Sequence, residues 1–329
     1  MSMILTRTPF RVSLFGGGTD FKFWYQNHGS KLITCSIGYY CYIALRILPP
    51  FFDSSNRIVW SKIEETSNIN EITHPVVRAC LNFYNINQGV EMHHIGDLPA
   101  RSGIGSSSSF TVGLIHALYV LLGRSVTKRQ IIDDAIFVEQ NLLKEYVGIQ
   151  DQIQVGYGGF NLIEIKQDGD FSVSPISISR DRINSLTENL LLFYTGISRL
   201  SSEITKHTIE SACKNDKPLQ EIAYLTEQAS AILTDDLKSL DLIGELLHHS
   251  WVMKKSLSSQ ISTESIDLIY EKARKLGALG GKVLGAGGGG FLLLYVPKEC
   301  QVNVRKALDG LVEIPFKLDQ FGTTLVQHT

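Results

Sequence analysis

Three glycine-rich segments, widely separated along the chain, constrain its fold more than any other feature. The run Gly16–Gly18 ends a strand-like segment that begins at Leu5, and a small-residue loop at 98–110 leads directly into a helix-like segment. The third and densest run is Gly285–Gly290. Glycine permits backbone conformations and close approaches that a Cβ atom forbids. We therefore expect each segment to be a turn that lies close to another stretch of backbone or to a ligand.

The rest of the chain changes from strand-rich to helix-rich. β-branched and aromatic runs predict strands at 5–15, 31–47 with Gly38 between two runs, 90–95, 160–165, 190–194, 291–296 and 313–318. Helical spacing of apolar residues predicts helices at 75–84, through 114–122, at 128–146 after an N-cap at Thr127, across most of 201–257, and at 262–276 and 302–308. This segregation indicates an α+β protein, and 329 residues suit two domains, at 1–185 and 186–329.

The central loop, Gly103–Ser109, has the composition of a phosphate-binding loop. Small residues let the backbone approach an anion, and the N–H groups at the start of the following helix favour negative charge. Serine also caps helices without any ligand, so the loop by itself leaves both interpretations open. The chain contains no GxxxxGK[ST] motif. The letters GxGxxG occur at Gly285–Gly290, but the predicted order there is helix, glycines, strand, which is not the order of a dinucleotide-binding fingerprint.

Composition excludes several classes of function. The formal net charge of −2 disfavours general binding to nucleic acid, which needs a concentrated positive face. The longest apolar stretch, 111–122, is too short to span a bilayer, and the first residues do not form a signal-peptide pattern. Five scattered cysteines without a CxxC pair indicate free thiols in a reducing compartment. We expect a cytoplasmic protein that binds neither nucleic acid nor membrane.

Taken together, the three glycine segments resemble the three motifs of the GHMP kinase superfamily, in the family's order and separations. The first motif is Thr8–Asp20, the second Pro99–Phe110 and the third Lys282–Phe291, and the likeness extends over essentially the whole chain. The resemblance implies an N-terminal domain like domain 2 of ribosomal protein S5 and a ferredoxin-like C-terminal domain. It also implies an active site between them that uses ATP and Mg²⁺.

Within the superfamily, the chain is most similar to D-glycero-D-manno-heptose 7-phosphate kinases. The run Phe15–Phe21, the segment Gly148–Gln152 and the segment Tyr194–Arg199 carry this likeness. The Gly-Glu-His sequence that galactokinases carry after the first strand is absent. The fucokinase-like branch shares several of these features, so it remains an alternative.

The resemblance assigns the chemistry to a few residues. Asp151 is the expected general base for the sugar's anomeric hydroxyl, with Arg11 beside it; a surface turn and a surface ion pair are the structural alternatives. Glu139 and Ser107 are the expected magnesium ligands, and Ser106 or Ser108 could replace Ser107. An exposed glutamate on a helix is the structural alternative for Glu139. The expected ATP-binding residues form the second motif: Ser102, Gly103, Ile104, Gly105, Ser106, Ser107 and Ser108.

The expected substrate contacts lie in the other two motifs and in one further segment. Asp20 would accept hydrogen bonds from sugar hydroxyls, and Arg199 would meet a phosphate; weaker candidates for the substrate's own phosphate are Arg7, Lys22, Arg101 and Lys206. The full expected set is Gly17, Gly18, Thr19, Asp20, Arg199, Gly287 and Gly288. For the glycines of the third motif, a purely structural turn is an equal alternative.

The resulting prediction is an ATP-dependent kinase that converts the heptose 7-phosphate to its 1,7-bisphosphate for surface-polysaccharide synthesis (capsule, lipopolysaccharide or S-layer). Another sugar 1-kinase, such as an L-fucokinase, is the nearer alternative. A catalytically silent sugar- or nucleotide-binding regulator is the more distant one. The sequence is compatible with a homo-oligomer.

Overall fold

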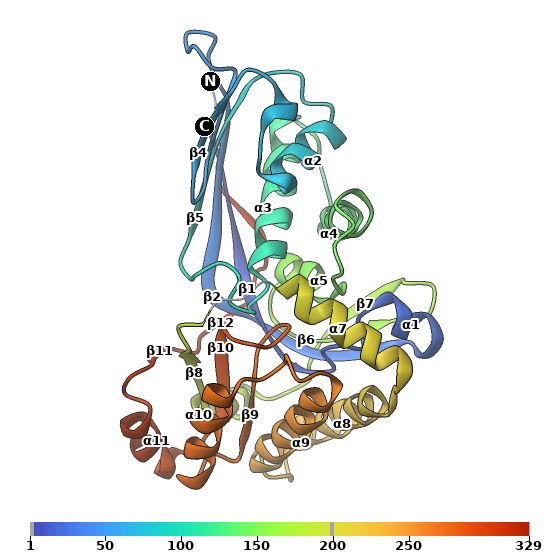
Figure 1. Ribbon diagram of the computed structural model, residues 1–329, viewed down its shortest axis with the longest axis vertical. Coiled ribbons are helices and arrows are strands. Elements are labelled where there is room, and N and C mark those ends of the chain that lie inside the picture. The colour runs from blue at the N-terminus through green and yellow to red at the C-terminus, as the bar shows by residue number, and fades with distance from the viewer. Residues whose placement is uncertain (1–2, 198–200, 329) are drawn as a thin grey trace.

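The computed structural model describes residues 3–197 and 201–328, and it contains two β-sheets with helices packed on them. In Figure 1 the larger sheet stands above the smaller one. The α+β prediction is confirmed.

The larger sheet has nine strands, built around two long ones. β1 (Ile4–Phe15) pairs along its length with β2 (Ser30–Ile47). The path β13-β1-β2-β5-β3-β4 is extended by β6, which pairs with β2 and β7, and by β12, which pairs with β2. The remaining bounds are β3 (Asn56–Val59), β4 (Ile63–Thr66), β5 (Val90–Gly96), β6 (Phe160–Ile165), β7 (Phe171–Pro175), β12 (Leu318–Asp319) and β13 (Thr324–His328).

The break expected at Gly38 is a bulge inside a single strand. The pairing of β1 with β2 shifts between Pro9 and Phe10, which face Tyr40 and Ile37 respectively, so two residues of β2 lie outside the ladder. A bulge bends its strand. This bend lets one half of β2 pair with β5 and the other half with β6.

Helix α3 (Ser106–Leu121) is the centre of the upper part and packs against β1 and β2 (Figure 1). It is buried on nearly all sides, as its apolar composition requires. Gly113 allows the close approach, because a Cβ at this position would lie 2.9 Å from Oγ1 of Thr8. The other helices here are α1 (Lys22–His28), η1 (Ile69–Glu71), α2 (Pro75–Phe83), α4 (Lys128–Phe137) and α5 (Gln150–Tyr157).

The predicted helix at 128–146 differs from the structure. Thr127 caps α4 as expected, accepting a hydrogen bond from the backbone N–H of Gln130. The helix then changes at Val138 into a π-helical turn, η2 (Val138–Leu142). Such turns are frequent at functional sites, and this one carries Glu139.

The smaller sheet has the order β11-β8-β10-β9, and all its pairings are antiparallel. Its strands are β8 (Leu190–Tyr194), β9 (Gly280–Val283), β10 (Phe291–Tyr295) and β11 (Val312–Ile314). Strand β9 was not predicted, so the third glycine segment joins two paired strands rather than a helix and a strand. The helices are α6 (Arg180–Glu188), α7 (Ser201–Lys214), α8 (Lys217–Leu233), α9 (Asp241–Leu257), α10 (Glu264–Lys275), η3 (Lys298–Cys300) and α11 (Gln301–Ala307).

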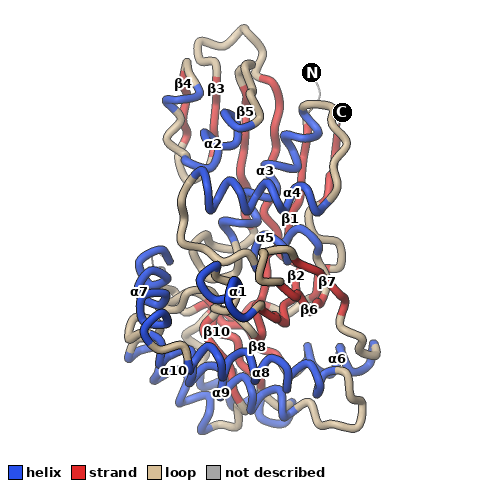
Figure 2. Tube along the Cα trace, turned by 90° about the vertical axis from the view of Figure 1, so that its right-hand side faces the viewer, coloured by secondary structure: helices blue, strands red, loops and turns tan. Residues whose placement is uncertain are grey.

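The end of the chain returns to the larger sheet. β13 pairs with β1, and both described ends of the chain lie at the top of Figure 2. The strand predicted at 313–318 is two short strands, β11 in the smaller sheet and β12 in the larger. The predicted division at residue 185 falls inside α6. The two sheets are thus formed by segments that do not divide cleanly into a first and a second half.

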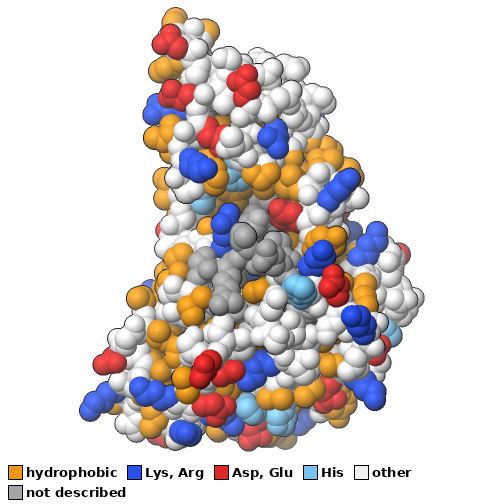
Figure 3. Space-filling view, in the orientation of Figure 1, with side chains coloured by type: hydrophobic (Ala, Val, Ile, Leu, Met, Phe, Trp, Pro, Cys, Tyr) orange, Lys and Arg blue, Asp and Glu red, His pale blue; other side chains and the backbone are white. Residues whose placement is uncertain are grey.

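None of the helices in residues 3–197 and 201–328 is long and apolar enough to cross a membrane. On the face of the molecule shown in Figure 3, basic and acidic side chains are interspersed over both parts.

Candidate active site

The second and third glycine segments touch where the two sheets meet. A Cβ at Gly285 would lie 2.5 Å from the Cα of Gly103, and both residues have positive φ angles, +66° and +81°. The backbone N–H of Phe291 donates to the carbonyl of Ser102 over 3.1 Å. This contact positions the central loop at the start of α3, and only glycine can provide it.

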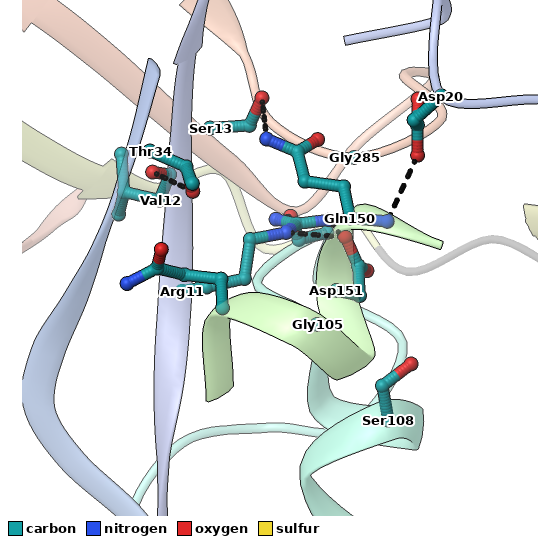
Figure 4. A network of polar contacts seen from close by, with 12 residues as sticks. Arg11, Val12, Ser13, Asp20, Thr34, Gly105, Ser108, Gln150, Asp151 and Gly285 are labelled. Carbon is teal, nitrogen blue, oxygen red and sulfur yellow. Dashed lines mark hydrogen bonds and ion pairs between the residues drawn. The ribbon is translucent and has the colours of Figure 1, made fainter. Parts of the chain in front are cut away.

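Arg11 and Asp151 form the core of the site (Figure 4). Nε and Nη2 of Arg11 donate to Oδ1 and Oδ2 of Asp151 over 2.6 and 2.7 Å, and Nη1 donates to the carbonyl of Gly103 over 2.6 Å. The Arg11 side chain is 6% exposed and that of Asp151 is 27% exposed. Gly105 covers the pair, since a Cβ there would lie 2.9 Å from Cγ of Arg11. The carboxylate is thus fixed in orientation and still reachable from solvent.

Asp151 lies in the first turn of α5, an element that the sequence did not predict. Asp20 is held beside the start of α5: the backbone N–H groups of Gly18, in the first glycine turn, and of Gln150, the first residue of α5, donate to its two carboxylate oxygens over 3.0 and 3.3 Å. A Cβ at Gly148 would overlap the Asp20 carboxylate, so this position requires glycine. Burial, and then the charge of Asp151, raise the pKa of Asp20. Two carboxylates from distant segments therefore face the same region.

The other residues of the first glycine turn have different surroundings. Thr19 is fully buried, and its hydroxyl contacts the carbonyl of Gly16 at 2.7 Å and the hydroxyl of Ser30 at 2.5 Å. Its side chain therefore holds the turn together. Gly17 is more open, with Ser13 as its nearest neighbour.

Glu139 is completely buried below the central loop. Its Oε2 accepts hydrogen bonds from the hydroxyl of Ser108, over 3.1 Å, and from the side-chain amide of Gln152. Its Oε1 has no hydrogen-bond partner within residues 3–197 and 201–328. Burial is the main cause that raises the pKa of Glu139 to about 7. The nearby Thr111 hydroxyl, which lowers the pKa of Glu139, donates to the carbonyl of Ser107. A buried carboxylate oxygen without a partner indicates a missing proton or cation.

The hydroxyl beside Glu139 is therefore that of Ser108, whereas the expected magnesium ligand, Ser107, is exposed one residue earlier on α3. No group of three or more His, Cys, Asp or Glu side chains in the described parts of the chain could bind a metal ion. A metal here would depend on one carboxylate, on serine hydroxyls and on oxygens of a ligand.

The remaining ATP-loop residues shape the start of α3. Ser102 donates to the carbonyl of Pro99 over 2.6 Å, and Ser106 accepts from the backbone N–H of Arg101 over 3.2 Å. Ile104 is buried, and its carbonyl accepts from the N–H of Arg11 over 2.9 Å. The helix begins at Ser106 without a side-chain cap, so its first N–H groups are available to an anion.

The third glycine segment is anchored mainly to protein. The backbone N–H of Gly288 donates to the carbonyl of Ile261 over 2.8 Å, and a Cβ at Gly287 would lie 2.5 Å from the same carbonyl oxygen. These contacts agree with the structural alternative for both glycines. Arg199, the remaining expected substrate contact, lies outside the described residues.

Sequence reasoning missed two lysines that belong to this region, Lys254 on α9 and Lys282 in β9. A lysine inside an apolar run next to a glycine segment was a usable signal for Lys282. Lys254 lies in an ordinary amphipathic helix, which gave no signal. The site also contains Gln150, whose side-chain amide donates to the hydroxyl of Ser13 over 2.9 Å (Figure 4).

Two family models match separate stretches of the chain. Residues 71–159 match the family model of the GHMP kinases N terminal domain, and residues 229–310 match that of the GHMP kinases C terminal. D-glycero-alpha-D-manno-heptose 7-phosphate kinase of Campylobacter jejuni is 28% identical over 326 residues, covering 94% of each chain. L-fucokinase/L-fucose-1-P guanylyltransferase of Bacteroides fragilis is 28% identical over 232 residues, covering 66% of this chain and 23% of that protein.

The solved structures show the likeness in fold. A D-glycero-D-manno-heptose 1-phosphate kinase from Bacteroides thetaiotaomicron superposes with a TM-score of 0.79 at 20% identity, covering 98% of this chain and 99% of that chain.

Proposed function

The chain belongs to the GHMP kinase family, and from this premise we propose that it transfers the γ-phosphoryl group of ATP to the anomeric C1 hydroxyl of D-glycero-D-manno-heptose 7-phosphate. The observation that carries the proposal is the fixed, solvent-accessible carboxylate of Asp151, held on both oxygens by Arg11. Phosphoryl transfer needs little covalent help from a protein, and it depends on positioning and on stabilising charge.

In the proposed reaction, a carboxylate oxygen of Asp151 accepts the proton of the anomeric hydroxyl. The sugar oxygen forms a bond to the γ-phosphorus while the bond from that phosphorus to the bridging oxygen breaks, and ADP leaves with the electron pair. Arg11 places a positive charge in contact with both oxygens of this carboxylate. It also keeps both oxygens in one orientation.

The phosphates of ATP would lie against the backbone N–H groups of the central loop and the first turn of α3. Magnesium suits the residues below this loop: carboxylate and hydroxyl oxygens are its preferred ligands, and Oε1 of Glu139 has no hydrogen-bond partner among the described residues. Glu139, with Ser108 or Ser107, would hold the ion. Bound magnesium would supply positive charge to the phosphate oxygens.

Asp20 is the proposed sugar contact, because a buried carboxylate whose oxygens receive two backbone N–H bonds can still accept hydrogen bonds from hydroxyl groups. The choice of a heptose 7-phosphate is supported by the relative from C. jejuni, which is similar over nearly its whole length. The product would serve surface-polysaccharide synthesis. L-fucose is the alternative acceptor, favoured by the shorter match to the B. fragilis protein.

The test is ADP release with Mg-ATP and a panel of acceptors: heptose 7-phosphate, sedoheptulose 7-phosphate, mannose 6-phosphate, mannose, L-fucose and galactose. We expect turnover to be greatest with heptose 7-phosphate. A preference for an unphosphorylated sugar would exclude the heptose phosphate and leave the kinase assignment intact. Absence of turnover with every acceptor would favour the silent regulator or an untested substrate.

A further inference from the structure

Two lysines reach the junction of the three glycine segments from the side of the smaller sheet. Lys282 is 4% exposed, and its ammonium group donates to the carbonyl of Leu14 over 3.2 Å, at the end of β1. It also lies 4.0 Å from the position that a Cβ would take at Gly17. The ammonium group of Lys254, on α9, donates to the carbonyl of Gly285, which packs against Gly103.

Neither ammonium group has a carboxylate partner among the described residues. Lys282 has one hydrogen-bond acceptor, and Lys254 has a second, distant one in the carbonyl of Val283 at 3.4 Å. An ammonium group has three donors, so each lysine keeps at least one donor without a partner in the part of the chain that the structure describes. By contrast, the adjacent Lys255 is paired with Asp267 at 3.0 Å.

The charges around the two lysines do not balance. Arg11 and Asp151 neutralise each other, which leaves Asp20 as the nearby carboxylate for two cations. Burial lowers the pKa of Lys254 to about 8, and burial with the neighbouring charges of Lys254 and Arg11 lowers the pKa of Lys282 well below its usual value. Burying unpaired cations is costly, and it is found chiefly where they meet a ligand.

We propose that Lys254 and Lys282 form a phosphate-binding site at the meeting point of the three glycine segments, beside Asp20 and the Arg11–Asp151 pair. The inference rests on the proposed function, which supplies two phosphate groups: the one that the acceptor sugar carries, and the phosphoryl group in transit from ATP. Both groups present negatively charged phosphate oxygens, which accept hydrogen bonds from ammonium donors. A role as simple tethers for the carbonyls of Leu14 and Gly285 would not need charge, since a neutral donor could hold each.

The test compares Lys282→Met and Lys254→Met with the matched control Lys255→Met. If the lysines bind the acceptor's phosphate, we expect the KM for the phosphosugar to rise by roughly tenfold or more, and the KM for ATP to change by less than about twofold. If they bind the phosphoryl group in transit, kcat should instead fall by roughly tenfold or more with both KM values nearly unchanged. Values of kcat and both KM within about threefold of wild type would overturn the proposal.

If the methionine variants do not fold, amine labelling of the wild type tests the same phosphate site. The amine of Lys254 should be modified by an amine-directed label, and inorganic phosphate at constant ionic strength should slow this modification while leaving that of Lys255 unchanged. Absence of protection at Lys254 by both inorganic phosphate and the phosphosugar would overturn the site. The acceptor panel tests the proposed function separately, because wild-type turnover does not depend on the outcome for these lysines.

Discussion

The guanidinium of Arg11 contacts both carboxylate oxygens of Asp151 although 140 residues separate them in the sequence. One comes from the first strand and the other from the first turn of a short helix. Gly105 of the central loop packs against both side chains. Arg11 therefore contacts both the expected base, Asp151, and the expected phosphate loop, through the carbonyl of Gly103.

Asp151→Asn should abolish most activity and leave the fold intact. Asparagine can still accept a hydrogen bond from Arg11, but it cannot accept a proton, so we expect kcat to fall by roughly 10² to 10⁴. Stability should decrease by about 1–3 kcal/mol, because Arg11 becomes a buried cation without a counter-charge. ADP release and urea unfolding measure both effects, with Asp168→Asn in the exposed hairpin turn as the control. Unchanged kcat would remove Asp151 from the mechanism.

Gly148→Ala should weaken the sugar site selectively. The added methyl group would overlap the carboxylate of Asp20 and displace it, so the KM for the sugar should rise while the KM for ATP stays constant. Gly38→Ala is the matched control, because its nearest neighbour would be at an ordinary 3.6 Å and neither glycine has a positive φ angle. Equal effects of the two substitutions would contradict a role of Asp20 in sugar binding.

Gly285→Ala should separate the second and third glycine segments. Residue 285 has a φ of +66°, and the added Cβ would press on Gly103, so we expect a loss of about 2–4 kcal/mol in the free energy of unfolding. The KM for ATP should also rise. Gly123→Ala has a similar φ of +63° with open space around it, and it should show only the backbone strain, about 1–2 kcal/mol. If the two variants behave alike, the contact between the segments is unimportant.

Glu139→Gln should raise the magnesium concentration needed for half-maximal activity by roughly tenfold or more, because an amide is a weaker ligand for a hard cation than a carboxylate. Titration of activity with MgCl₂ at fixed ATP measures this. The exposed Glu164→Gln, in β6, serves as the control and should titrate as the wild type does. An unaltered requirement for magnesium would place the ion elsewhere.

Asp20 should make the stability of the ligand-free protein depend on pH. Its pKa is raised in the folded state, so above its ordinary value of 3.8 the folded protein holds a proton that the unfolded chain has lost. Stability therefore falls as the pH rises from 3.8 through the raised pKa of the folded state. Asp20→Asn should remove this part of the dependence, measured by urea unfolding at several pH values. An identical pH profile for the variant would show that Asp20 ionises normally.

The local elements near each glycine segment could be predicted because their signals are local. The strand at 5–15 follows from its β-branched and aromatic residues, and the helix after the central loop from its apolar spacing. The π-helical turn at Glu139 and the short helix that carries Asp151 could not, because both depend on packing under the loop rather than on propensity. Strand β9 could not be predicted for the same reason: two of its four residues are glycine, and it forms by pairing with β10.

The three glycine turns, the α+β class and the family of the chain follow from local sequence patterns, because glycine's backbone freedom and apolar periodicity act over a few residues. Which of the polar residues meet depends on the packing of distant segments. This packing joined Arg11 to Asp151, placed Ser108 rather than Ser107 against Glu139, and brought Lys254 and Lys282 to the same junction. These relations depend on how two sheets pack against each other over long sequence separations, and no local pattern records that geometry.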